Sequence, residues 1–436
     1  MPKTRRIRSH TVKGNSGARY RAQTNSAQRR CLSTHRQLTD REPHFFKFIP
    51  SQCLRIHQTE RQSLERADLD YFSIYIAPAS GPSGLTTTGF ESRIKDLCAK
   101  DRLRGTKWLV GSSTGAMRFV ALIGSLVSTE RNLTEELMKH YCWMQYNAGD
   151  TPQILRPMME QLYQLVAPPD LMSDILTHPQ FRLAIIVSNI REAYQHLPDW
   201  ALRAVLGCYA VGNLVNERAL AGLCERIVCY SGDEVPEFLA NGVGGENNTR
   251  FVKLVKENVY EVLHGTTCIP FVQERCESIP GAGEGLYLDG ALTDYMLNVQ
   301  FTDPSHRALL LSDQPTSNVY PTALDAMFRW RTVPISYLGH CSVLHLSEHF
   351  ALRMIDGQLP RLKDWFNKEY MAQPESRQKK WRAAYDLSAV AWPRKLSEVT
   401  VENAVQEEEV TDNARSVETR LRSTSWKDIL AWLWTR

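Results

Sequence analysis

The segment Gly111-Ser112-Ser113-Thr114-Gly115 is the part of the sequence best suited to covalent chemistry. In a Gly-x-Ser-x-Gly pattern the middle serine stands on a sharp turn between a strand and a helix, which lifts its hydroxyl clear of the sheet. Gly111 and Gly115 are expected because the turn is strained and backbone segments pass close to it. The serine then lies at the start of the helix, where free amides and the helix dipole stabilise developing negative charge. Ser113 is therefore the candidate nucleophile, and a turn without chemistry is the alternative interpretation.

The residues on both sides of this segment have the pattern that such a turn requires. Lys107–Val110 is a short run typical of a strand. After Gly115, apolar residues recur at helical spacing and predict an amphipathic helix: Met117, Val120, Ala121, Gly124 and Val127.

A serine hydroxyl needs a base that accepts its proton. Asp289 is the candidate, because it follows the predicted strand 285–288 directly and precedes Gly290. Ligands bind at the carboxyl edge of open α/β sheets, so we expect the Asp289 carboxylate and the Ser113 hydroxyl to meet there. The alternatives are three downstream histidines, none of them in a recognisable loop after a strand, and an aspartate that follows a helix-like run: His340, His345, His349 and Asp356.

The two motifs together resemble the patatin-like phospholipase family, in which a Ser–Asp dyad works without histidine. Residues 111–116 match the family's nucleophile elbow, and Asp289-Gly290-Ala291 matches its Asp-Gly-Gly/Ala motif. Between them, residues 266–272 are similar to the Ile-Pro-containing stretch that precedes the aspartate in these enzymes. The resemblance covers about residues 70–311, with 176 residues between the serine and the aspartate. It implies that Ser113 and Asp289 form the dyad, with Gly290 supporting the aspartate.

The family also carries a glycine-rich loop after its first strand, and the amides of this loop form the oxyanion hole. The corresponding loop here is Ser80–Gly84, after the predicted strand 72–77, with Gly81 located 32 residues before Ser113. The loop departs from the family pattern, because Pro82 has no amide and the basic residue is missing. The resemblance therefore implies four amide donors, those of Gly81, Ser83, Gly84 and Thr114. Losing one donor costs about 10²–10³ in turnover, so a slow or inactive protein is an alternative.

The resemblance implies acyl transfer from a lipid ester through an acyl-enzyme. The leading hypothesis is a lipid acyl hydrolase of the phospholipase A or lysophospholipase type, acting on a phospholipid or another acylglycerol. No cofactor and no metal are expected. A transacylase would use the same residues. The competing hypothesis is a catalytically impaired patatin-like protein that serves as a membrane- or protein-binding module.

Strands and helices alternate along the chain, which indicates an α/β fold. The fold class that we predict is a three-layer α/β/α, patatin-like arrangement with a mostly parallel central sheet. Further strands are predicted at 183–187 and 308–311, and helices at 87–102, 134–146, 152–165 and 198–206.

The composition predicts three parts: a basic extension (1–66), a catalytic domain (67–372) and a C-terminal segment (373–436). Residues 1–36 contain ten Lys or Arg and no Asp or Glu, and a segment with so few apolar residues is expected to be disordered. Residues 398–412 hold six acids and no base, as in a solvated linker. The Trp-rich end, 426–436, would suit a short helix in a membrane interface or one docked on the body, and docking is favoured.

The overall composition excludes several protein classes. With 436 residues, 43% hydrophobic and 23% charged, the chain is that of an ordinary globular protein. It has no apolar run near the roughly 20 residues of a membrane span and no signal-peptide core. The basic arm lacks interleaved aromatic residues, so no nucleic-acid partner is expected. Peripheral contact with a membrane stays open, and the sequence predicts no oligomeric state.

Ten cysteines are scattered along the chain without a Cys-x-x-Cys pair. This scatter is typical of reduced thiols, and a cytoplasmic location is expected. Cys224 and Cys229 are close enough in sequence to be ligands, but packing is the favoured interpretation.

Overall fold

The computed structural model describes residues 54–58, 69–145, 150–216, 219–242, 245, 248–315, 318–327, 333, 335–355, 357–392 and 400–403. The chain divides into two compact units, residues 1–49 and residues 50–436. All described residues belong to the second unit. The predicted roles of the basic arm and of the Trp-rich end, and the rival Asp356, lie outside the described residues.

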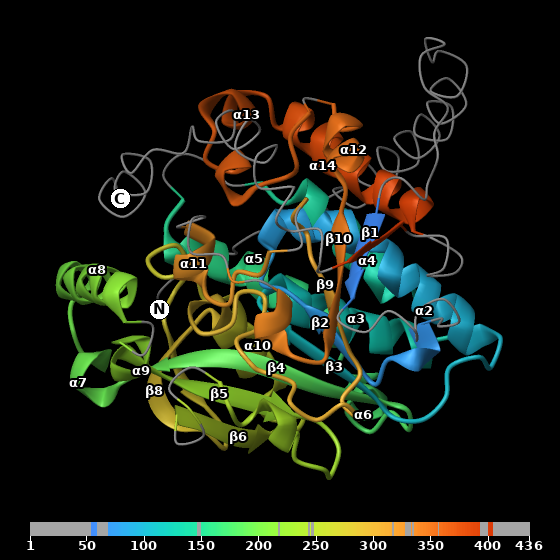
Figure 1. The fold of residues 1–436 in the computed structure, drawn as a ribbon. Coiled ribbons are helices and arrows are strands. Elements are labelled where there is room, and N and C mark those ends of the chain that lie inside the picture. Colours follow the sequence, from blue (N-terminus) through green and yellow to red (C-terminus); the bar gives the residue numbers. More distant parts are fainter. Residues whose placement is uncertain are drawn as a thin grey trace, which may run out of the picture. The chain divides into compact units, whose positions relative to one another are not determined.

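A mixed, mostly parallel sheet forms the centre of this unit (Figure 1). The strand order is β11-β1-β10-β9-β2-β3-β4-β5-β6, and β8 pairs with both β4 and β7. The five neighbours β10, β9, β2, β3 and β4 run parallel, whereas β1 and β5 are antiparallel to β10 and β4. The bounds are β1 (Leu54–Gln58), β2 (Ile74–Ala77), β3 (Lys107–Ser112), β4 (Phe181–Ile190), β5 (Cys224–Tyr230), β6 (Thr249–Lys253), β7 (Cys276–Ile279), β8 (Gly283–Leu288), β9 (Ala308–Leu311), β10 (Cys341–Leu346) and β11 (Thr400–Asn403).

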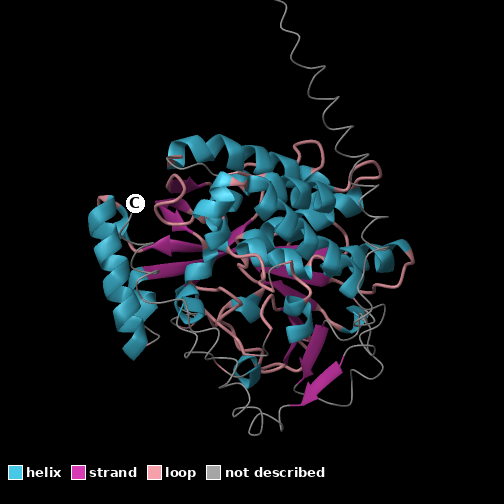
Figure 2. Ribbon diagram, turned by 90° about the horizontal axis from the view of Figure 1, so that it is seen from above, coloured by secondary structure: helices cyan, strands magenta, loops and turns pink. Residues whose placement is uncertain are grey.

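Helices complete the three-layer α/β/α arrangement, and Figure 2 shows the helices and strands from above. On one face α3 lies against β2, β3 and β4 and is surrounded by α2, α4, α5 and α6. The bounds are α2 (Gly89–Ala99), α3 (Thr114–Val127), α4 (Leu133–Trp143), α5 (Pro152–Val166), α6 (Met172–Leu176), α7 (Glu192–Gln195), α8 (Asp199–Val215), α9 (Ala219–Leu223), α10 (Val259–Thr267), α11 (Ala323–Met327), α12 (Glu348–Leu352), α13 (Lys368–Ala372) and α14 (Pro374–Ala391).

Strand β2 shows why the sheet is apolar on both faces. Ile74 and Ile76 belong to a buried cluster that the segment 296–301 covers on one side. Tyr75 points to the other side, where its ring centroid lies 5.0 Å from that of Phe90 on α2. Parallel strands that are buried on both faces require such continuous apolar runs, and this explains why the run was visible in the sequence.

The predicted strands and helices are present, with shifted bounds. The predicted strand 107–110 extends to Ser112 as β3, and the helix after it is α3. Three elements, β1, α14 and β11, lie beyond the predicted domain limits of 67 and 372. Strand β1 pairs with β10, and α14 packs against α2, where the Gly89 amide donates to Ser388 Oγ at 2.9 Å. Among the described helices, none is long and apolar enough to cross a membrane.

Candidate active site

Ser113 is the single residue that connects strand β3 to helix α3, and its backbone is strained. Its φ is 52° and its ψ is −128°, a conformation that costs a non-glycine residue about 1–3 kcal/mol. A Cβ on Gly115 would lie 2.3 Å from the Ala77 carbonyl oxygen, and one on Gly111 would lie 2.8 Å from the Ala116 nitrogen. Both glycines are therefore required by close backbone approach, as the sequence predicted.

Asp289 follows β8 and meets the serine directly. The Ser113 hydroxyl donates to Asp289 Oδ2 at 2.8 Å across 176 residues of sequence. The residue after Asp289 must be a glycine, because a Cβ on Gly290 would lie 2.3 Å from the Ile186 carbonyl oxygen and 2.7 Å from Ser112 Cβ. The predicted contact of hydroxyl and carboxylate is thus present, and Gly290 makes it sterically feasible.

Burial changes the basicity of this carboxylate. The side chains of Ser113 and Asp289 are 8% and 6% exposed. Desolvation raises the pKa of Asp289 from 3.8 to about 7, although hydrogen bonds from the Ala291 amide and the Ser113 hydroxyl act to lower it. A carboxyl with this pKa is available as a base near neutral pH and can also return the proton.

The backbone around Ser113 is held by three side-chain hydrogen bonds that the sequence motifs did not reveal. The Ser113 amide donates to Thr266 Oγ1 at 2.9 Å, and this hydroxyl donates to the Ile186 carbonyl at 2.6 Å. Ser112 Oγ donates to the Asp294 carbonyl at 2.8 Å. The Ser113 amide is already bonded to Thr266. The amide of Thr114 is therefore the candidate donor to an oxyanion at the beginning of α3.

The predicted oxyanion segment is not an open loop, as the sequence suggested, but the start of the 3₁₀ helix Gly81–Thr87, labelled η4. Strands β2 and β3 are parallel neighbours, so η4 and α3 begin side by side at the same edge of the sheet. In a 3₁₀ helix each amide from the third residue on bonds to the carbonyl three residues back. Of the predicted donors in η4, the amides of Ser83 and Gly84 are therefore used within the helix, and only that of Gly81 lacks a partner there. Gly81 has a φ of 54°, and Pro82 takes a place in the first turn where its missing amide is tolerated. Gly81, Ser83, Gly84 and Thr114 therefore cluster at these two helix starts.

Two buried contacts anchor η4, and neither was predicted. At its beginning, the Ser83 hydroxyl contacts the carboxyl of Asp313. At its end, Arg118 of α3 donates to Thr87 Oγ1 at 2.8 Å and forms an ion pair with Glu91 at 2.6 Å. Arg118 and Glu91 are 1% and 0% exposed. No motif marks these residues, because the contacts join segments far apart in sequence.

The three histidines named as alternative bases are not bonded to the dyad. Among the described residues, no histidine hydrogen-bonds to Ser113 or to Asp289. His345 is buried in β10 with Nδ1 at 2.9 Å from the Leu346 carbonyl, whereas His349 is exposed on α12. Burial raises the pKa values of the Cys224 and Cys229 thiols to about 12, which fits the packing interpretation. Within the described residues, no group of three or more His, Cys, Asp or Glu side chains could hold a metal ion.

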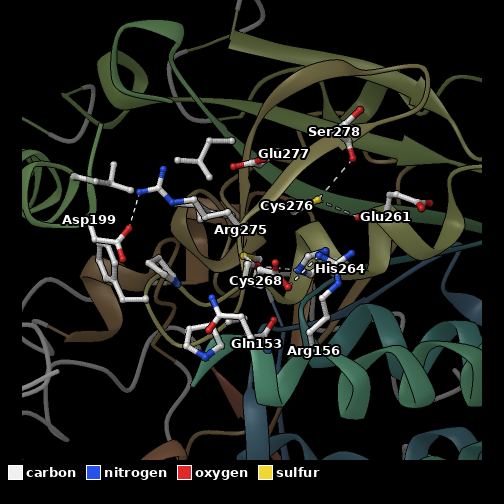
Figure 3. Close-up of a pocket in the computed structure, with 18 residues that line it drawn as sticks. Gln153, Arg156, Asp199, Glu261, His264, Cys268, Arg275, Cys276, Glu277 and Ser278 are labelled. Carbon is white, nitrogen blue, oxygen red and sulfur yellow. Dashed lines mark hydrogen bonds and ion pairs between the residues drawn. The ribbon is translucent and has the colours of Figure 1, made fainter. Parts of the chain in front are cut away.

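A cavity of about 480 Å³ is lined in part by the end of β8, directly before Asp289, and Figure 3 shows residues of its lining. Cys268 and Leu288 line it, and the Cys268 carbonyl accepts the Asp289 amide at 2.9 Å. Figure 3 shows Arg275 and Asp199 directed toward each other across one side, with an ion pair of 2.6 Å. Neither dyad residue lines this cavity. Burial raises the pKa of the Cys268 thiol to about 12, so this thiol is not a nucleophile at neutral pH.

The sequence matches no protein-family model and no curated protein. The geometry of the dyad and its surroundings is therefore what supports a function for this chain.

Proposed function

We propose that this protein is a lipid acyl hydrolase in which Ser113 is the nucleophile and Asp289 the base. The observation that carries the proposal is the 2.8 Å hydrogen bond from the Ser113 hydroxyl to a buried carboxylate, on a strained turn at the beginning of α3. A serine paired with a base and facing free helix amides is the arrangement needed for acyl transfer. The resemblance of both motifs to patatin-like phospholipases supports a fatty-acid ester as the substrate.

In the proposed mechanism Asp289 accepts and returns one proton in each of the two steps, acylation and deacylation. Asp289 takes the Ser113 proton as the oxygen attacks the ester carbonyl, and amides at the starts of η4 and α3 stabilise the oxyanion. The tetrahedral intermediate expels the alcohol, which receives the proton from Asp289. Water then gives a proton to Asp289 and attacks the acyl-enzyme, and Ser113 recovers its proton as the fatty acid leaves.

A binding module without catalysis is the second candidate, and Pro82 is the observation that favours it. Proline contributes no amide where the resembled family has a donor, so the oxyanion would be less well stabilised. Both the hydrolase and the binding module would be compatible with contact at a membrane surface. A reducing location such as the cytoplasm is proposed from the free cysteines of the described part of the chain.

Release of fatty acid from a panel of esters tests the proposal. We would supply phosphatidylcholine, lysophosphatidylcholine and triacylglycerol in mixed micelles to the wild type, S113A, D289N and the double variant. We expect release by the wild type, loss by about 10³-fold or more in each single variant, and no further loss in the double variant, because the dyad acts as a unit. Vesicle binding without any release, or release that persists in S113A, would favour the binding module.

A further inference from the structure

A second buried carboxyl lies close to the oxyanion segment. Asp313 follows β9, which is the parallel neighbour of β2. It therefore reaches the sheet edge at which η4 begins, and its side chain is fully buried. Asp313 Oδ2 contacts the hydroxyl of Ser83, which stands in the first turn of η4, two residues after the candidate donor Gly81.

The hydrogen bonds of Ser83 indicate where the proton is. Ser83 Oγ is 2.7 Å from the carbonyl oxygen of Ser80, and a carbonyl oxygen can only accept. The single hydroxyl proton of Ser83 cannot serve both the Ser80 carbonyl and an ionised Asp313. If Asp313 is protonated, it donates to Ser83 and Ser83 donates to the Ser80 carbonyl, so both contacts of the Ser83 hydroxyl are hydrogen bonds.

The surroundings of Asp313 also favour the neutral acid. Its Oδ1 is buried without a hydrogen-bond partner, a position that is costly for a charged oxygen. Burial raises the pKa of Asp313, although the side chains of Ser83, Gln314 and Ser80 act in the opposite direction.

Among the described residues, no ion pair or hydrogen bond joins a cationic side chain to Asp313. The charged groups on the elements packed against η4 and β9 each have other partners: Arg118 with Glu91, Lys380 with Asp364, Arg377 over the Trp381 ring, and His345 at the Leu346 carbonyl.

We propose that Asp313 is a positioning residue that acts as a neutral acid, and that the chain Asp313–Ser83–Ser80 fixes the turn that presents the Gly81 amide to the oxyanion. This inference rests on the proposed acyl hydrolase function. An ionised carboxylate behind the turn would oppose the negative charge of the tetrahedral intermediate. As pH rises, loss of the Asp313 proton therefore releases the turn and lowers kcat, whereas loss of the Asp289 proton activates the serine. The two carboxyls give opposite limbs of one pH profile.

The test compares Asp313→Asn with Asp313→Ala on a soluble short-chain p-nitrophenyl ester. An asparagine amide still donates to Ser83 but cannot ionise. We expect Asp313→Asn to keep most of the wild-type kcat near neutral pH and to lack the fall with rising pH. Asp313→Ala loses roughly 10- to 100-fold in kcat with little change in KM, because the Gly81 amide is displaced but substrate contacts remain. Asp303→Asn, on an exposed loop, is the control and keeps the wild-type profile.

Three outcomes would overturn the inference: Asp313→Asn as impaired as Asp313→Ala, a descending limb that persists in Asp313→Asn, or an unchanged kcat in Asp313→Ala. Thermal unfolding tests the neutral state of Asp313 without any need for catalysis, so it separates failure of this inference from failure of the proposed function. A buried acid that is neutral when folded and ionised when unfolded loses its contribution to stability as pH rises from its unfolded pKa. The wild-type Tm should therefore fall relative to that of Asp313→Asn as pH rises above the unfolded pKa of 3.8, even if no ester is hydrolysed. A constant difference contradicts the neutral acid.

Discussion

Thr266 holds Ser113 in place from the far side of the turn: its hydroxyl oxygen lies 2.9 Å from the Ser113 amide nitrogen, and its proton goes to the Ile186 carbonyl of β4 at 2.6 Å. The nucleophile is thus tied to the neighbouring strand through one threonine hydroxyl. The same segment continues to Cys268, whose carbonyl accepts the Asp289 amide. One stretch of chain therefore supports both members of the dyad.

Thr266→Val should weaken both stability and catalysis. The valine keeps the volume but leaves the Ser113 amide and the Ile186 carbonyl unpaired, which costs about 1–3 kcal/mol for each buried group left without a partner. Urea unfolding measures the loss of stability, and the rate of ester hydrolysis measures the displacement of Ser113. Thr266→Ser retains the hydroxyl and should keep most of both. Equal behaviour of the two variants would show that the hydroxyl is not what holds the turn.

Gly290→Ala should abolish the dyad by a steric effect. The added methyl group would meet the Ile186 carbonyl oxygen at 2.3 Å, a contact that forces the backbone of Asp289 away from Ser113. We expect loss of activity and a clearly lower Tm. Gly207→Ala, in α8, is the matched control, because a Cβ there meets no atom within 4 Å. It should be neutral or slightly stabilising, since alanine favours helix. A fully active Gly290→Ala enzyme would contradict the described turn.

The backbone strain at Ser113 predicts that a residue which tolerates a positive φ makes the folded protein more stable. Ser113→Gly relieves the positive φ, whereas Ser113→Ala keeps it, and both remove the hydroxyl. We expect the glycine variant to be more stable than the alanine variant by about 1 kcal/mol, the difference between relieved strain and the added freedom of the unfolded chain. Chemical denaturation of the two inactive variants measures this difference. A glycine variant that is less stable would show that the turn carries no strain.

The elements that carry the dyad could be predicted from the sequence, because each one has a local pattern of residue types. The strand before Ser113, the amphipathic helix after it and the Asp-Gly turn after β8 all follow from spacing and residue type. Strand β5 left no such pattern, since it contains Glu225 and Arg226. Arg226 is nevertheless fully buried, because Asp294 pairs with it at 2.7 Å.

The surroundings of the dyad could not be predicted for the same reason. Asp313 and Ser83 are 230 residues apart, and Thr266 was visible only as part of a family-like stretch without a role. The assignment of residues 80–84 to an open loop was natural for a Gly-Pro-Ser-Gly sequence, yet hydrogen bonds of the 3₁₀ type close it into a helix. Long-range pairing of polar side chains leaves no periodic signal in one sequence.

The pKa of Asp289 predicts how activity and stability change with pH. The base must be ionised, so the rate of acylation should rise with pH and reach half its maximum at about pH 7 on the acid limb. Because burial raises the pKa of Asp289 above its unfolded value of 3.8, its effect on stability has the opposite sign, and the free energy of unfolding falls as pH rises from about 4 to 7.

Asp289→Asn checks both parts of this prediction. The variant should lose acylation at every pH and should gain Tm relative to the wild type as pH rises through this window, because it carries no buried charge. Acylation rates and Tm values measured across the window give the comparison. An acid limb with its midpoint near pH 4 would show that the carboxyl is not desolvated in the working protein.

Covalent labelling with a fluorophosphonate, read out by peptide mass spectrometry, tests the central claim most directly. The probe reacts with a serine that an adjacent base has activated. The account predicts one phosphonate adduct on Ser113 in the wild type, none in S113A, and a strongly slowed reaction in D289N. A wild-type protein that stays unlabelled, or an adduct that persists on another residue in S113A, would contradict it.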